Sequence, residues 1–203
     1  MNVEGLSDMR LDALREISAV GAGHAATTLS GLVGRTLRIE VPTIEVIGIS
    51  QMPYVLGGPE DVVGAVYARL GGEIHGGLLY IATPEAVRTV LELLGEVPGS
   101  GDSAPDDRLA SVFVAAMGHL IDSFVRAVSE MTGLEGRATE TSWAYDMAGA
   151  LLEAVVSEIG TQTDSAVFVR TAFIDADRSV EVAMFFVPDP ESLRAILGRV
   201  GLA

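Results

Sequence analysis

Two carboxylates that could do chemistry, Asp12 and Glu16, lie four residues apart in a segment with the apolar period of a helix, and Ala19 follows them. At about 100° per residue, these positions fall within about 60° of one another on the side away from the apolar stripe. The corresponding side of a second helical segment carries small or short side chains, at Ser111, Ala115, Gly118 and Asp122. Such a low-relief strip indicates either an ordinary solvated face or a docking surface for another protein.

Other sites of chemistry have weaker support in the sequence. The three histidines, His24, His75 and His119, are scattered and show no metal-ligand spacing, so no metal site is expected. The string 21–26 has the form G-x-G-x-x-A, but it lies within a helical pattern rather than between a strand and a helix, which argues against a dinucleotide site. There is no cysteine, which excludes disulfides, thiolate metal sites and a cysteine nucleophile.

Two long amphipathic helices must position the strip. The first is expected to end near Gly34 and the second near Gly133. Their predicted buried stripes are Leu11, Leu14, Ile17, Ala25, Leu29 and Leu32 in the first, and Phe113, Met117, Leu120, Phe124, Val128 and Met131 in the second. A further helix is predicted over about 146–158, and strands near 36–49, 62–70, 73–82, 138–145, 165–174 and 179–187.

The chain reads as two similar halves, about 8–97 and 106–203, joined by a linker at about 98–105. Each half has a long helix, then two β-branched runs around a turn, then a short helix. The pairs Pro84 and Pro190, Arg88 and Arg194, and Gly95 and Gly201 are all separated by the same number of residues. Turns this short make the paired strands antiparallel. The sequence therefore predicts a single α+β domain with a continuous, mostly antiparallel, six-stranded sheet flanked by long helices.

The composition of the chain limits the classes of partner that we expect it to bind. Asp and Glu number 28 against 13 basic residues, so the formal net charge is −15. A field of this sign repels phosphate backbones, so no nucleic-acid binding is expected. No apolar run reaches the length of a membrane span, and the first residues do not resemble a secretion signal, so we expect no membrane insertion and a cytoplasmic location.

The helices and the hairpin resemble the CheC family of bacterial and archaeal chemotaxis, which is related to CheX and to the middle domain of the flagellar switch proteins FliM and FliY. EISAVGAGHAATTLSGLVG (16–34) resembles the first helix of the family, and LGGPEDVVGAVYARLGGEIHGGLLY (56–80) resembles the hairpin that follows. DMAGALL (146–152) matches a further family segment. The resemblance covers nearly the whole chain and implies two pseudosymmetric halves.

The resemblance implies a phosphatase fold that acts on the aspartyl phosphate of the response regulator CheY. The family signature is [D/S]-x-x-x-E-x-x-N, once in each half. Its Glu contacts the regulator's conserved lysine, and its Asn amide orients the attacking water. The enzyme then supplies positioning rather than a covalent nucleophile. No cofactor is expected on this chain, and the Mg²⁺ belongs to the phosphorylated partner.

Both signatures are incomplete in this sequence. Asp12 and Glu16 match the first half, but Ala19 stands where Asn is expected. Ser111 matches the second half, but Ala115 replaces Glu and Gly118 replaces Asn. His24 also stands where the family has Asn, and the roles of His24 and His119 are left open.

Three functions are therefore compatible with the sequence. The first is binding of phosphorylated CheY with weak or altered phosphatase activity, in which Glu16 is the main contact. The second is a non-catalytic adaptor for CheY or for the receptor deamidase CheD. Family members bind CheD through the segment that matches DMAGALL, so the implied contacts are Asp146, Met147, Ala148 and Gly149. The third is a structural component of the flagellar or archaellar switch.

Overall fold

The computed structural model describes residues 8–40, 42–55, 57–159, 165–175 and 178–200. Capping residues set the ends of several of its helices. Asp106 accepts a hydrogen bond from the Leu109 amide, and Gly133 ends the same helix in the left-handed conformation. The helices are α1 (Asp8–Val33), η2 (Ile49–Tyr54, a 3₁₀ helix), α2 (Pro84–Leu93), α3 (Asp107–Thr132), α4 (Ala148–Ile159) and α5 (Pro190–Arg199).

One antiparallel sheet runs through the molecule in the order β1-β6-β7-β4-β3-β5, and β2 also pairs with β6. Its strands are β1 (Arg38–Ile39), β2 (Thr43–Gly48), β3 (Val62–Gly72), β4 (Gly76–Ala82), β5 (Gly136–Met147), β6 (Ser165–Asp175) and β7 (Arg178–Pro188). The predicted fold class, a single α+β domain with a continuous antiparallel sheet, is confirmed.

The sheet has seven strands rather than six because the strand predicted over 36–49 is divided. Pro42 lacks the amide hydrogen that a sheet ladder needs. The pairing register with β6 shifts by one residue between β1 and β2. The two pieces together still form the edge of the sheet beside β6.

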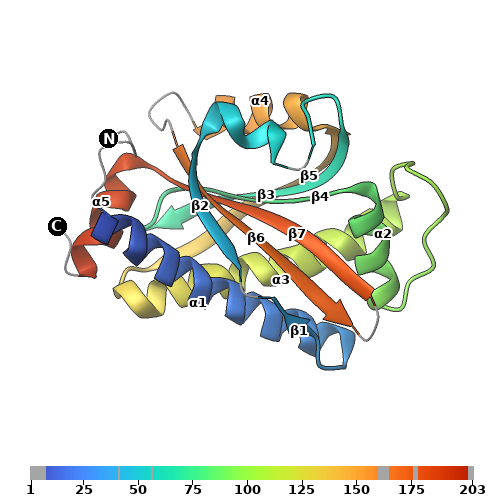
Figure 1. Ribbon diagram of the computed structural model, residues 1–203, viewed down its shortest axis with the longest axis horizontal. Coiled ribbons are helices and arrows are strands. Elements are labelled where there is room, and N and C mark those ends of the chain that lie inside the picture. Colours follow the sequence, from blue (N-terminus) through green and yellow to red (C-terminus); the bar gives the residue numbers. More distant parts are fainter. Residues whose placement is uncertain (1–7, 41, 56, 160–164, 176–177, 201–203) are drawn as a thin grey trace.

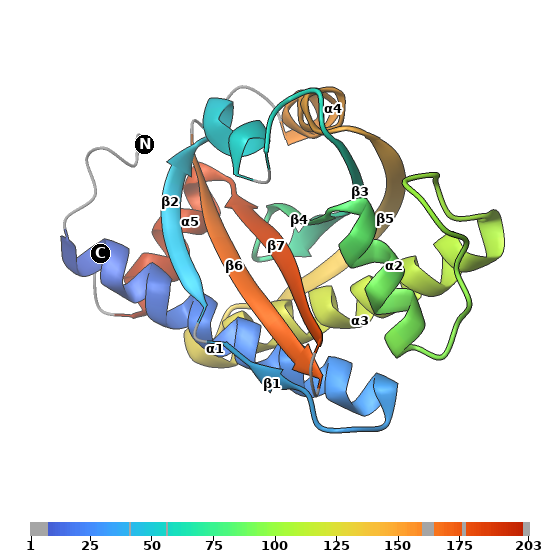
Figure 2. The same ribbon diagram turned by 45° about the vertical axis from the view of Figure 1, so that its right-hand side comes forward.

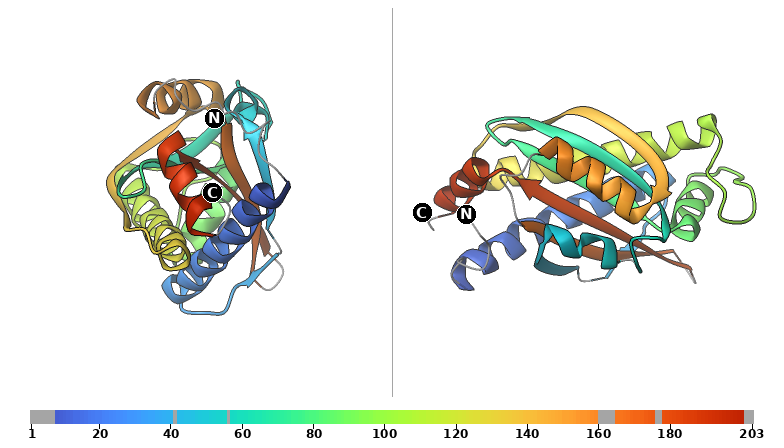
Figure 3. Two further views of the ribbon diagram at one scale, coloured as in Figure 1. Left: turned by 90° about the vertical axis from the view of Figure 1, so that its left-hand side faces the viewer. Right: turned by 90° about the horizontal axis from the view of Figure 1, so that it is seen from above.

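The sheet separates two layers of helices (Figure 1). The long helices α1 and α3 cover one face, with α2 and α5 at the two ends. On the other face, η2 and α4 pack over the sheet, as Figure 3 shows from above. Each layer encloses its own buried apolar cluster. The larger cluster contains the long helices, and it is this cluster that sets which sides of α1 and α3 face outward.

The helices α1 and α3 run in opposite directions and pack closely against each other (Figure 2). Gly21 lies against the ring of Phe124, and the hydroxyls of Thr28 and Ser123 hydrogen-bond across the interface. By length and composition alone α3 could cross a membrane, but more than half of that window is buried inside the protein, as expected for a core helix. Most apolar residues of α3 therefore pack in the interior of the protein.

The element order repeats on the two sides of the linker: long helix, first strands, a short helix, a hairpin and a terminal helix. Each part adds an edge strand to the hairpin of the other, since β1 and β2 pair with β6, and β5 pairs with β3. This order is compatible with half-repeats at about 8–97 and 106–203, and that division stays a prediction.

Candidate functional site

The predicted site positions lie on the outward sides of the two long helices, as the helical period predicted. Helices α1 and α3 are both 26 residues long, and the two sets of positions are the fifth, ninth and twelfth residues of each helix. Five of these side chains are exposed and the sixth position is half-buried: Asp12, Glu16, Ala19, Ser111 and Ala115 are exposed, and Gly118 is half-buried. We call these sets the α1 motif and the α3 motif.

The α1 motif is acidic and one of its charges is already paired. The Arg15 guanidinium donates to the Asp12 carboxylate, with 2.9 Å between Nη1 and Oδ1. Both side chains are largely exposed, so the pair stabilises the helix by less than about 1 kcal/mol. Glu16 makes no hydrogen bond or ion pair with another residue that the structure describes. Glu16 is therefore available to a partner in a way that Asp12 is not.

The α3 motif offers no charged group at its three positions. The Ser111 hydroxyl donates to the Asp107 carbonyl of its own helix, with 2.7 Å between the oxygens. Ala115 has only a methyl group, and a Cβ placed on Gly118 would meet no atom within 4 Å. This surface can accept a closely approaching partner, but neither Ala115 nor Gly118 can orient a water molecule through a side chain.

The two motifs cannot act as one combined site. Helices α1 and α3 are antiparallel, and each motif lies in the first half of its helix (Figure 1). At 1.5 Å per residue, the packing of Gly21 against Phe124 places Ala19 and Gly118 roughly 12 Å apart along the helix axes. Each motif therefore presents its own docking position on the outer layer.

Apolar side chains beside the α1 motif were missed by the sequence analysis. Met9 and Val20 are 65% and 37% exposed, and they lie one helical turn to either side of Asp12 and Glu16. Leu32, predicted to be in the buried stripe, is 40% exposed, because it lies in the last turn of α1 beyond most of the packing with α3. An exposed helix face that combines carboxylates with apolar groups is typical of a protein-binding surface.

The segment 146–149 lies on the opposite side of the sheet and differs from its prediction. Asp146 and Met147 belong to β5, where Val62 pairs with Met147, so the helix begins at Ala148 rather than at 146. Asp146 and Met147 are exposed, but Ala148 is buried in the smaller apolar cluster and offers no side chain to a partner.

The backbone of this junction is fixed by the loop before β3. The amides of Ala148 and Gly149 donate to the carbonyls of Asp61 and Pro59, both at 2.9 Å. A Cβ on Gly149 would lie 3.0 Å from Pro59, so this glycine allows the loop to approach. Asp146 and Met147 therefore project from a rigid support.

The histidines do not gather into a site. His24 is half-buried on α1 and His119 is exposed on α3. Within the described ranges no group of three or more His, Asp or Glu side chains is placed to hold a metal ion. The described part of the chain thus offers helix faces and a strand–helix junction as its candidate functional surfaces.

Comparison with known proteins finds similar chains among chemotaxis and flagellar proteins. It is 24% identical to the CheY-P phosphatase CheC of Bacillus subtilis over 201 residues, which cover 97% of this chain and 96% of CheC. Its fold matches Thermotoga maritima FliY with a TM-score of 0.77 and 17% identity, over 97% of this chain and 98% of FliY. It also matches a chain of the Borrelia burgdorferi CheX–CheY–BeF₃–Mg²⁺ complex with a TM-score of 0.50 and 13% identity. This match covers 82% of the present chain and 94% of the matched chain.

No protein-family model matches the chain. The full-length alignment with CheC and the shared fold of FliY and CheX confirm the resemblance to the CheC family.

Proposed function

We propose that this relative of CheC binds the phosphorylated form of a CheY-type response regulator through the α1 motif and dephosphorylates it only weakly. The proposal rests on one observation above all, that Glu16 is exposed and unpaired within the described structure while Ala19 and Gly118 occupy the two Asn positions. The surface that would recognise the regulator is therefore present, and the amide that would orient water is missing from both motifs.

The physical argument separates binding from chemistry. In-line attack on an aspartyl phosphate needs a water held in the correct geometry, and such positioning supplies much of the rate enhancement. The methyl group of Ala19 and the hydrogen of Gly118 can neither donate nor accept a hydrogen bond. Glu16 can still bind a regulator cation, and Met9 and Val20 provide apolar contact on the same face. The Mg²⁺ of the reaction would be carried by the regulator.

The test measures binding and phosphate release on the same protein. A CheY-type regulator is held in its active state with beryllofluoride and Mg²⁺ for titration calorimetry, and is phosphorylated for the release assay. We expect binding that requires beryllofluoride, together with phosphate release only slightly faster than without the protein. Glu16→Ala should weaken binding about tenfold, and Thr27→Ala, an exposed change elsewhere on α1, should leave it unchanged.

Two results would contradict this proposal. Fast release that Glu16→Ala does not reduce would show that another site does the chemistry. Equal binding of the active and inactive regulator would remove the link to phosphorylation.

A second candidate function is an adaptor for CheD, favoured by the exposed junction between β5 and α4. Met147 is 45% exposed beside Val62, which is 39% exposed, and Asp146 adds a charge to this small apolar patch. Asp146→Arg should reduce affinity for CheD about tenfold in a pull-down titration while leaving regulator binding intact. Intact CheD affinity in this variant would reject the assigned surface.

The likeness to FliY gives a third candidate, a structural role in the switch. It predicts association with motor proteins that does not depend on regulator phosphorylation, and the beryllofluoride comparison above distinguishes it from the first proposal.

A further inference from the structure

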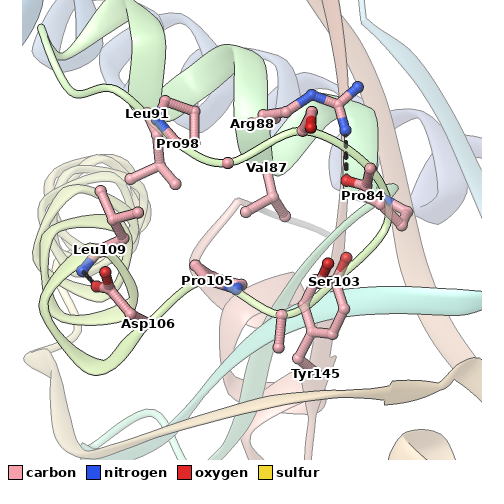
Figure 4. Close-up of a pocket in the computed structure, with 14 residues that line it drawn as sticks. Pro84, Val87, Arg88, Leu91, Pro98, Ser103, Pro105, Asp106, Leu109 and Tyr145 are labelled. Atoms are coloured by element: carbon pink, nitrogen blue, oxygen red, sulfur yellow. Dashed lines mark hydrogen bonds between the residues drawn. The ribbon is translucent and has the colours of Figure 1, made fainter.

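The linker between the two parts of the chain forms one wall of a half-open cavity of about 220 Å³ that none of the proposed functions uses. It lies between α2, residues 98–105 and the start of α3 (Figure 4). Arg88 donates to the Gly101 carbonyl at 2.8 Å, and the Tyr145 hydroxyl donates to the Asp102 carbonyl at 2.9 Å. The linker is thus held at two points, which gives the cavity a fixed wall.

The walls of the cavity are apolar and polar in about equal parts, and its charged groups are separated. Arg88 and Tyr145 lie toward one end and Asp106 toward the other (Figure 4). The apolar lining consists of Pro84, Val87, Leu91, Pro98, Pro105 and Leu109. Small-molecule sites combine apolar walls with a few polar groups that fix the orientation of the ligand.

The charges in the cavity favour an anion at the Arg88 end. Arg88 brings a positive charge to this end of the cavity, although the whole chain carries a net charge of −15. The Asp106 carboxylate is already engaged, since it accepts from the Leu109 amide at 2.8 Å at the start of α3. A half-buried guanidinium has further donors that a bound carboxylate would satisfy.

The second part of the chain contains the same arginine without the cavity. Arg194 corresponds to Arg88, but its Nε donates to the Pro190 carbonyl of its own helix at 3.0 Å. Arg88 instead reaches across to the linker, where it donates to the Gly101 carbonyl. The different setting of Arg88 therefore depends on the linker.

We propose that this cavity binds a small monocarboxylate with an apolar body, whose carboxylate contacts Arg88. The volume equals that of about seven water molecules at about 30 Å³ each, which suits a ligand of roughly ten non-hydrogen atoms. A dicarboxylate of similar length binds less well, because its second charge would face Asp106. The site is independent of the regulator-binding surface on α1.

The experiment titrates the full chain with benzoate and follows backbone amide signals by NMR. Benzyl alcohol is the neutral probe of similar size, and terephthalate is the dicarboxylate. We expect benzoate to shift signals from 84–91 and 98–109, with at least about tenfold weaker binding of the other two probes. Arg88→Gln should weaken benzoate binding about tenfold, and the matched change Arg194→Gln should leave it unchanged.

A second variant guards against an indirect effect of Arg88→Gln on the linker. Ser103→Trp keeps Arg88, places a ring in the cavity from an exposed linker position and should abolish benzoate binding. The proposal is overturned if benzoate shifts no signal in these ranges, if benzyl alcohol binds equally well, or if both variants bind benzoate like the unaltered chain.

Discussion

Ala19 is the residue of the α1 motif that distinguishes the proposed binding surface from a catalytic one. It is exposed on α1, one turn beyond Glu16, and its methyl group leaves the α1 motif without an amide. Restoring that amide is the smallest change that could turn the proposed binding surface into a catalytic one.

We therefore expect Ala19→Asn to raise the rate of phosphate release from a phosphorylated CheY-type regulator by at least about tenfold, because an oriented amide contributes to the positioning of water. The substitution costs about 0.5 kcal/mol of helix propensity, which the fold should tolerate. The rate is measured by phosphate release with the regulator in excess.

Thr27→Asn is the control for this change, since it adds an amide to an exposed position of the same helix outside the motif. Equal rates for the two variants would mean that the α1 motif does not contact the phosphoryl group.

The exposed site positions could be predicted from sequence because helical periodicity alone decides which side of α1 and α3 faces outward. Leu32 and Ala148 could not be placed in this way. Leu32 is apolar but lies beyond most of the helix packing, and Ala148 is small but lies under the loop that carries Pro59. Their exposure depends on neighbours distant in sequence.

At the scale of elements, the contact between α1 and α3 depends on the absence of a side chain at Gly21. A Cβ there would lie 2.6 Å from Cε2 of Phe124, a fully buried ring that packs edge-on against Phe186. Gly23, two residues later, has nothing within 4 Å of its Cβ position. Replacing these two glycines of α1 with alanine should therefore change the stability of the protein in opposite directions.

Gly21→Ala should lower the free energy of unfolding by about 1–3 kcal/mol, because the core cannot accommodate the added methyl group. Gly23→Ala should raise it by about 0.5–1 kcal/mol, because alanine favours the helix and meets no neighbour. Urea denaturation followed by circular dichroism measures both. If both variants were stabilised, α1 and α3 would not be packed as described.

Most elements could be predicted because each carries a local signal, either a capping residue, an apolar period or a short turn. The divided strand at 38–48 and the strand that continues through Met147 depend instead on pairing. Asp146 and Met147 continue β5 because Val63 and Val62 of β3 lie opposite them. A single sequence does not show which strand will be the neighbour.

At the scale of the whole molecule, the two parts of the chain hold each other through the sheet. The first part contributes β1 and β2 to the edge beside β6, and the second part contributes β5 to the edge beside β3. The linker is exposed along most of 99–104 and lies outside the strand pairing. The covalent connection is thus separate from the interactions that form the core.

A chain with a protease site inserted between Gly99 and Ser100 should therefore remain folded after cleavage. The two fragments should elute together in size-exclusion chromatography and should separate only in denaturant. An uncleaved sample of the same protein is the reference for circular dichroism and elution volume. Fragments that come apart in native buffer would contradict the interleaved sheet.

This interleaving also bears on how the two ends of the molecule can evolve. An assembly of two identical half-length subunits would change both copies with every mutation of its single gene. Because one polypeptide carries both long helices, the ninth residue of α1 can be a glutamate while the ninth residue of α3 is an alanine. A mutation can therefore alter one of these helix faces and leave the other unchanged.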